Sequence, residues 1–174
     1  MIDESLPFTP VRIAVLTVSD SRDASTDKSG DRLAGLITDA GHELADRAIV
    51  RDDVGALVER LRAWVDDQSI DCVISTGGTG VTGRDVTPEA LDQMGGKVIP
   101  GFGELFRWLS YANIGTSTIQ SRACAIVVDG TYIFALPGST GAVSDGWNGI
   151  LKTQLDSRHK PCNFVELMPR LRET

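Results

Sequence analysis

Two patterns of apolar residues alternate along the first part of the chain. Residues 11–18 (VRIAVLTV) are mostly aliphatic or β-branched, which predicts a buried strand. Between residues 33 and 40, apolar side chains recur at spacings of three and four, which predicts an amphipathic helix. Gly41 follows directly, as is typical of a helix end. The chain therefore begins with a strand and a helix.

The same order repeats in the next thirty residues. Residues 42–51 can form a second strand, and the apolar stripe of residues 54–65 predicts a second helix that Asp53 is placed to cap. Residues 72–74 (CVI) predict a third strand. Successive strand and helix units are typical of a parallel sheet with helices on both faces, joined by right-handed crossovers.

Further helices are expected in the second half of the chain. Thr87 is expected to cap a short helix that has Pro88 at its first position. Residues 143–151 predict a last core helix. The helix predicted over residues 102–111 is apolar on more than one side, with Trp108 off its main face. Because such a helix is often buried against a partner, we expect the protein to self-associate.

A hairpin completes the predicted sheet. Residues 123–128 and 132–136 are β-rich runs joined by Asp129-Gly130, a dipeptide typical of a tight hairpin turn. The predicted fold class is therefore α/β, with a mostly parallel sheet, helices on both faces and one antiparallel hairpin.

Residues 75–89 (STGGTGVTGRDVTPE) connect the third strand to the next helix and carry the clearest chemical signal. Backbone without Cβ atoms can approach a ligand closely, and several N–H groups pointing into one concavity suit the oxygens of a phosphate. Asp85 would repel a phosphate unless a divalent cation lay between them. The loop therefore predicts a phosphate site together with a metal ion.

Two common nucleotide motifs do not describe this loop. Gly78, Gly80 and Gly83 satisfy G-x-G-x-x-G literally, but residues 84–86 intervene before the helix begins, which argues against a dinucleotide fingerprint. No Gly-Lys-Ser/Thr closes the loop, so the Walker A pattern also fails. The alternative that the glycines form only a tight turn is less favoured, because such a turn needs one or two glycines.

Polar residues end several of the predicted strands. Ser19-Asp20, Arg51-Asp52 and Ser75-Thr76 end the first three, and Pro137-Gly138-Ser139 follows the last. Ligands of parallel sheets gather at the carboxyl ends of the strands, so we expect these groups to meet at one edge. Asp52 and Asp85 could there hold a magnesium ion that carries triphosphate oxygens. Helix capping remains an open alternative for Asp52 and for Ser139.

Composition limits the partners and the compartment. The 174 residues, 41% hydrophobic and 24% charged, fit one domain with a sizeable core. A net charge of −7 argues against a nucleic-acid partner. No apolar run approaches the roughly 18 residues of a membrane span, so we expect a cytoplasmic protein without a membrane partner. Cys72, Cys124 and Cys162 are far apart and odd in number, which predicts reduced thiols.

Several motifs occur together in the order of a known family. They are Thr76-Gly77-Gly78-Thr79-Gly80, residues 84–90 (RDVTPEA), residues 100–104 (PGFGE) and residues 136–139 (LPGS). In this combination the chain resembles the MoaB/MogA family of molybdenum cofactor biosynthesis proteins over most of its length. Residues 106–110, residues 114–122 and the tail 161–164 (PCNF) are similar to the MoaB branch. The resemblance implies a three-layer α/β fold, a single molybdopterin-binding domain over residues 1–174 and assembly as a homotrimer or homohexamer.

The resemblance also implies an activity. Active members of the family transfer AMP from Mg-ATP to the terminal phosphate of molybdopterin, and their two acidic residues match Asp52 and Asp85, which would be catalytic and hold Mg²⁺. The remaining candidates for binding phosphate, nucleotide or pterin lie at the strand ends and in the glycine loop. They are Ser19, Asp20, Thr76, Gly77, Gly78, Thr79, Gly80, Pro137, Gly138 and Ser139.

Two other functions remain open at this point. The protein could bind and deliver molybdopterin without catalysis, in which case no AMP would be transferred. It could also act as a nucleotide-responsive oligomeric scaffold for other molybdenum cofactor enzymes, in which case capture of these partners would depend on the aromatic helix and be indifferent to Asp85.

Overall fold

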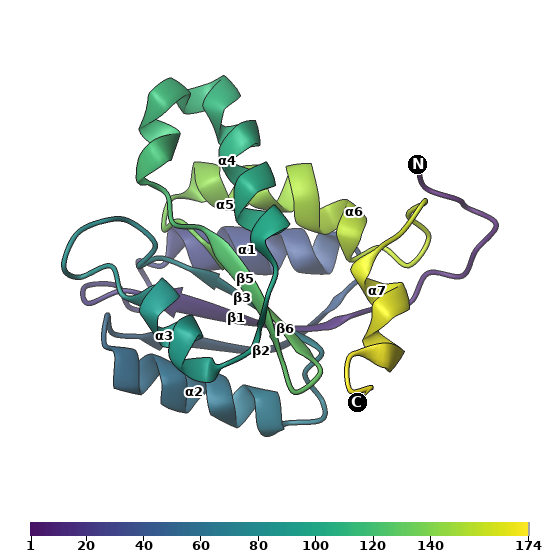
Figure 1. Cartoon of the computed structure of the whole chain (residues 1–174), viewed down its shortest axis with the longest axis horizontal. Helices are drawn as coiled ribbons and strands as arrows, with labels where there is room; N and C mark the ends of the chain where they lie inside the picture. Colours follow the sequence, from purple (N-terminus) through teal and green to yellow (C-terminus); the bar gives the residue numbers. More distant parts are fainter. Residues whose placement is uncertain (174) are drawn as a thin grey trace.

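Six strands form one mixed sheet at the centre of the computed structural model, which describes residues 1–173 (Figure 1). The strand order is β2-β1-β3-β6-β5-β4. The first four strands in this order run parallel, whereas β5 pairs antiparallel with both β6 and β4. The strands are β1 (Arg12–Val18), β2 (Glu43–Val50), β3 (Cys72–Thr76), β4 (Lys97–Val98), β5 (Cys124–Val128) and β6 (Thr131–Leu136). The predicted α/β class, mostly parallel with one antiparallel hairpin, is confirmed.

Helices cover both faces of this sheet. Figure 1 shows α1, α4 and α5 on one side and α2 and α3 on the other. The helices are α1 (Lys28–Asp39), α2 (Val54–Asp66), α3 (Thr87–Met94), α4 (Pro100–Ile114), the 3-10 helix η1 (Gly115–Gln120), α5 (Thr140–Gly146), the π-helical turn η2 (Trp147–Leu151), α6 (Lys152–Gln154), α7 (Phe164–Leu167) and the 3-10 turn η3 (Met168–Arg170). No helix within residues 1–173 is both long enough and apolar enough to cross a bilayer.

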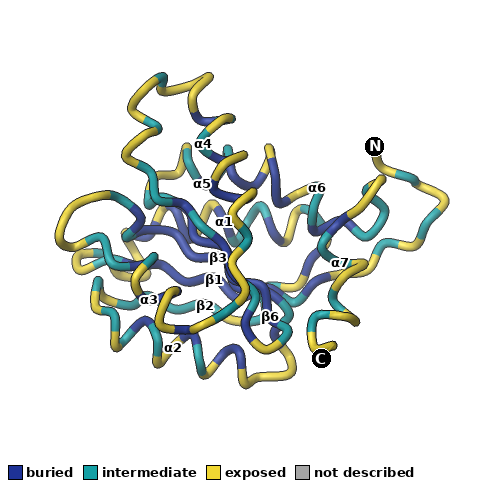
Figure 2. The backbone as a smooth tube through the Cα atoms, in the orientation of Figure 1, coloured by how far each residue is buried: buried dark blue, intermediate teal, exposed yellow. Residues whose placement is uncertain are grey.

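The strands bury side chains on both faces, because each strand directs alternate residues to opposite sides. In β1, Ile13 and Val15 join the core beneath α1 and α5, whereas Ala14 and Leu16 join the core beneath α2 and α3. Figure 2 shows the resulting buried centre along β1, β3 and β6. The near-continuous apolar run that predicted the first strand is therefore the signature of a strand covered on both sides.

The start of α3 differs from the sequence expectation. Thr87 does not cap this helix: Val86 occupies the cap position without a side-chain hydrogen bond, and Thr87 is already the first helical residue. The Thr87 hydroxyl instead donates to the carbonyl of Gly77 at 2.9 Å. Pro88 consequently lies one position later than expected. A tertiary contact with the glycine loop has replaced the local capping bond.

Several short elements have no counterpart in the sequence prediction. They include β4, η1, α7 and η3. The strand β4 has two residues, too few for a periodic pattern, and exists because it pairs with β5. Both η1 and α7 span at most six residues, so neither buries a face regular enough to recognise.

The segment formed by α4 and η1 projects from the body and exposes apolar side chains. Figure 2 shows that this projection is largely exposed beyond the first turns of α4. Phe102 and Phe106 are buried, but Leu105, which its spacing groups with them, is 39% exposed. Trp108 is 72% exposed. The large apolar residues exposed on this α4–η1 surface are Leu105, Trp108, Tyr111, Ile114 and Ile119.

Candidate functional site

A polar cavity of about 410 Å³ lies at the carboxyl ends of β1, β2, β3 and β6. All but two of the predicted site residues line it. Asp20 lies beside it and accepts the backbone N–H of Asp52 at 3.3 Å, and Thr76 lies beneath it, buried, with its hydroxyl donating to the carbonyl of Pro137 at 3.0 Å. The cavity is lined by Val18, Ser19, Arg22, Asp52, Gly77, Gly78, Thr79, Gly80, Asp85, Pro137, Gly138 and Ser139.

The glycine loop, residues 75–89, needs glycine at positions 77 and 78. Gly77 and Gly78 have φ angles of +111° and +64°, in the region that other residues rarely adopt. A Cβ atom on Gly77 would lie 2.2 Å from the carbonyl oxygen of Val18, and one on Gly78 would lie 2.4 Å from the hydroxyl of Thr87. The loop therefore passes so close to β1 and α3 that side chains are excluded.

Not every amide in this loop is free to bind a phosphate. The N–H of Gly77, expected to contribute, donates to the carbonyl of Leu136 at 2.9 Å and extends the pairing of β3 with β6. Among residues 1–173, no acceptor is found for the N–H groups of Gly78 and Thr79. These two amides are the ones that a bound anion could use.

The two carboxylates in the cavity differ in their environments. Burial raises the pKa of Asp52, and the negative charges of Asp20 and Asp85 raise it further. Burial would also raise the pKa of Asp85, but hydrogen bonds from Thr82 and Gly80 together with the charge of Arg122 hold that pKa below its usual value. The backbone N–H and the hydroxyl of Thr82 donate to Asp85 Oδ2 at 2.9 and 2.7 Å. Asp85 is therefore the more firmly ionised of the pair.

A cation that the sequence interpretation did not select also lines the cavity. Arg22 is the one positively charged side chain among the cavity residues of the described chain. Its Nη2 donates to the carbonyl of Gly138 at 2.9 Å, and its Nη1 donates to the hydroxyl of Ser29 at 2.6 Å. Only its place in the loop after β1 could have pointed to it, and no spacing rule separates it from an ordinary surface arginine. Its charge balances part of the acidic rim.

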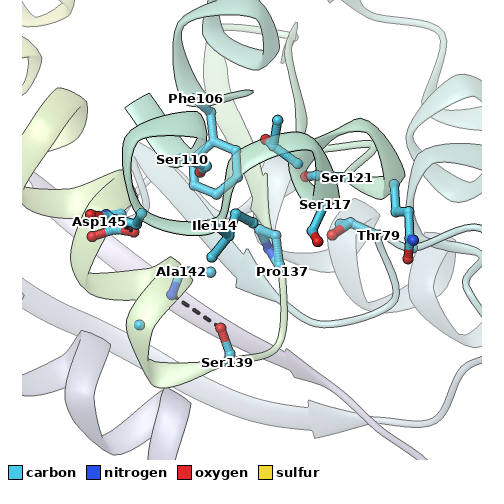
Figure 3. Close-up of a pocket in the computed structure, with 15 residues that line it drawn as sticks. Thr79, Phe106, Ser110, Ile114, Ser117, Ser121, Pro137, Ser139, Ala142 and Asp145 are labelled. Atoms are coloured by element: carbon cyan, nitrogen blue, oxygen red, sulfur yellow. Dashed lines mark hydrogen bonds between the residues drawn. The ribbon is translucent and has the colours of Figure 1, made fainter. Parts of the chain in front are cut away.

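A second cavity of about 520 Å³ adjoins the first, and sequence reasoning missed it. Both cavities are lined by Thr79, Gly80, Pro137 and Ser139, so they share a wall. Figure 3 shows Phe106, Ile114, Pro137 and Ala142 around the opening, with Asp145 at one side. These residues come from α4, α5 and the turn after β6. A mixed apolar and hydroxyl lining of this size can hold a planar ring, and we call this second space the ring cavity.

Two residues on the shared wall differ in their hydrogen bonding. The hydroxyl of Ser139 accepts the N–H of Ala142 at 3.1 Å, drawn as a dashed line in Figure 3, and so caps α5. The capping interpretation of Ser139 and its position at the site therefore hold together. The hydroxyl of Thr79 is buried without a hydrogen-bond partner among residues 1–173, which is unusual for a native polar group.

A magnesium ion fits the donor set of the first cavity. Asp52 and Asp85 offer carboxylate oxygens, the ligands that Mg²⁺ prefers. Within residues 1–173, no group of three or more His, Cys, Asp or Glu side chains could hold a metal by itself. Mg²⁺ commonly binds through one or two carboxylates together with water and substrate phosphates. The site therefore suits a metal that arrives with a phosphate ligand.

Comparison with known proteins points to one family. Residues 14–157 match the family model described as a probable molybdopterin binding domain. The chain is 46% identical to molybdenum cofactor biosynthesis protein B of Escherichia coli K12 over 164 residues, which cover 94% of the chain and 96% of that relative.

Solved structures give the same result. A crystal structure of molybdenum cofactor biosynthesis protein B superposes with a TM-score of 0.82 at 40% identity, covering 84% of this chain and 92% of the other. The tungsten cofactor synthesizing protein MoaB from Pyrococcus furiosus superposes with a TM-score of 0.73 at 31% identity, covering 94% and 98%.

Proposed function

The chain belongs to the family of molybdopterin-binding domains of molybdenum cofactor biosynthesis, and from this premise we propose that it transfers AMP from ATP to the terminal phosphate of molybdopterin. The observation that carries the proposal is the meeting of Asp52, Asp85 and Arg22 with the glycine loop in one cavity. Binding a triphosphate requires acidic groups that hold a cation, and a basic group and free amides that bind phosphate oxygens.

The reaction forms one bond and breaks one. An oxygen of the molybdopterin phosphate bonds to the α-phosphorus of ATP, and the bond from that phosphorus to the bridging oxygen breaks. Pyrophosphate leaves with the electron pair. Because both reactants are strongly negative, the protein contributes alignment and charge neutralisation rather than covalent chemistry.

Five residues of the cavity have a defined task in this proposal. Asp52 and Asp85 would hold Mg²⁺, which when bound neutralises and orients phosphate oxygens. The N–H groups of Gly78 and Thr79 and the guanidinium of Arg22 bind phosphate oxygens directly. The ring cavity accommodates one ring of the two substrates, so that the reacting phosphates lie across the shared wall.

We further propose that the protein assembles through its α4–η1 surface as a trimer or hexamer. Large apolar side chains that are exposed together, with an aromatic residue among them, are typical of a buried interface. This surface lies next to the ring cavity, since Ile114 belongs to both.

One assay tests the catalytic proposal against its alternatives. Purified protein is incubated with molybdopterin, ATP and MgCl₂, and adenylylated molybdopterin and pyrophosphate are measured. Formation of both in equal amounts is expected. Tight molybdopterin binding without product would support a carrier instead. If the protein neither binds molybdopterin nor forms product, the scaffold function remains. That function is then examined by capture of pathway enzymes on wild-type and Trp108→Ser protein.

A further inference from the structure

Arg122 connects the end of η1 to the glycine loop, although the sequence places it about forty residues away. Its Nε donates to the carbonyl of Gly80 at 2.6 Å, and its Nη2 donates to the carbonyl of Asp85. Its backbone N–H donates to the carbonyl of Thr79 at 2.8 Å. One residue thus contacts both ends of the segment 80–85, which carries a proposed metal ligand.

The guanidinium is itself held in place from the other side. Glu89, in the first turn of α3, accepts hydrogen bonds from both terminal nitrogens of Arg122, at 3.2 Å for Nη2. The planar fork of arginine can make these bonds at once, whereas a lysine ammonium cannot reproduce their geometry. Arg122 therefore ties η1, the glycine loop and α3 together in one fixed arrangement.

The loop between the two anchored carbonyls has one other tie to the rest of the chain, the ion pair of Arg84 with Asp20, in which Arg84 Nε donates at 2.9 Å. Both side chains of this pair are exposed, so the pair contributes little to the stability of the loop. Residues 81–84 are exposed, and their apolar member Val81 packs against no core cluster. Fixing the backbone of an exposed residue costs about 1–2 kcal/mol of conformational entropy, so a loop of this kind takes one shape only when its ends are held. The carboxylate of Asp85 points back to the backbone of Thr82 and Gly80, inside this same segment.

We propose that Arg122 is a positioning residue whose guanidinium fixes the Asp85 carboxylate in the geometry required for the reaction. It lines neither the polar cavity nor the ring cavity, and in this proposal it acts through the loop. This inference rests on the proposed adenylyl transfer for its kinetic consequence, but its structural consequence, an ordered segment 80–85, does not depend on any activity.

The test compares Arg122→Lys with Arg62→Lys. Arg62 is a matched control, because its guanidinium also donates to a backbone carbonyl, that of Met94 at 2.6 Å, and lies near an acidic residue, Asp129. We expect Arg122→Lys to lower kcat by about 10- to 100-fold, as is usual for groups that orient a metal ligand, with little change in the Kd for molybdopterin. Arg62→Lys should retain wild-type kcat.

A double-mutant cycle distinguishes positioning from a general structural role. If Arg122 acts through Asp85, Arg122→Lys should lower the residual activity of Asp85→Asn no further. An equal loss in both backgrounds would show that Arg122 does not act through Asp85 and would overturn the proposal.

Hydrogen exchange supplies a readout that needs no activity. We expect faster amide exchange in peptides covering residues 77–88 of Arg122→Lys, and no change in Arg62→Lys. Unchanged exchange would overturn the positioning role of Arg122 even in an active enzyme. Faster exchange in a protein that transfers no AMP would support the structural role of Arg122 and reject only the proposed adenylyl transfer. Should Arg122→Lys fail to fold, Glu89→Gln weakens the same anchor and should raise exchange in the same peptides.

Discussion

Asp52 and Asp53 are neighbours in the chain but serve different parts of the structure. Asp53 Oδ1 accepts the N–H of Ala56 at 2.8 Å and caps α2, whereas Asp52 lines the polar cavity together with Asp85. The backbone at Asp53 is extended, so its side chain turns toward the helix that follows. Asp53 therefore fills the cap position of α2, and the carboxylate of Asp52 remains available to a ligand.

Substitution of the carboxylates should separate these tasks. We expect Asp52→Asn and Asp85→Asn each to lower adenylyl transfer by about 100-fold or more, because a charged group aimed at the reacting phosphates is removed. Asp53→Asn is the matched control: asparagine also caps helices, and this residue is outside the cavity. Initial rates at saturating ATP measure the effect, and equal activity of all three variants would contradict the assignment.

The acid side of the pH profile should report Asp52. Its pKa is raised by burial and by Asp20 and Asp85, so the ionised form that binds a cation is lost at a higher pH than for an ordinary aspartate. As pH falls, kcat/KM should therefore decline before Asp85, whose pKa is lowered, becomes protonated. Rates measured between about pH 3 and 8 test this order, using about 3.9 as the reference value for aspartate. A decline that begins only below that value would refute it.

The same shift has a consequence for stability. A raised folded-state pKa means that the ionised Asp52 destabilises the native protein at neutral pH, and that this penalty disappears once the pH is below the unfolded value. Asp52→Asn should therefore raise the melting temperature at neutral pH by a few degrees while abolishing activity, and the difference from wild type should vanish near pH ~3. Thermal unfolding at both pH values measures it, and a lower melting temperature at neutral pH would contradict the prediction.

Adding a methyl group at Gly77 should destabilise the protein. In Gly77→Ala the new Cβ would meet the backbone of Val18, and the φ angle of +111° is strained for alanine, so we expect a loss of at least about 1–3 kcal/mol in the free energy of unfolding. Gly83→Ala is the control in the same loop, because a Cβ atom there would have no neighbour within 4 Å and its φ is not positive. Urea unfolding compares the two, and similar stabilities would argue against the close packing of β1 and the loop.

The α4–η1 surface should control assembly. We expect Trp108→Ser to dissociate the oligomer at micromolar concentration, because large aromatic residues contribute most to interfaces. Leu167→Ser, which also removes an exposed apolar side chain but lies on α7, should leave the assembly unchanged. Sedimentation velocity measures both, and a wild-type protein that is monomeric in this experiment would remove the interface proposal.

Local sequence patterns specify the strands, the long helices and the composition of the glycine loop. Apolar periodicity over 11–18, 33–40 and 54–65 is local information, and each pattern is found in the structure as β1, α1 or α2. The position of the polar cavity also followed from sequence, because the carboxyl ends of parallel strands meet at one edge of the sheet.

Which groups share that edge is settled by packing between distant segments. Folding decides which of Asp52 and Asp53 lines the cavity and which caps α2. It also brings the Gly77 N–H to the carbonyl of Leu136 and the Thr87 hydroxyl to the carbonyl of Gly77. The same is true of Arg22, of the ring cavity and of Arg122, whose partners lie far away in the chain. No local pattern encodes such contacts, because an arginine that binds a distant backbone carbonyl and one that is solvated can occur in the same local sequence.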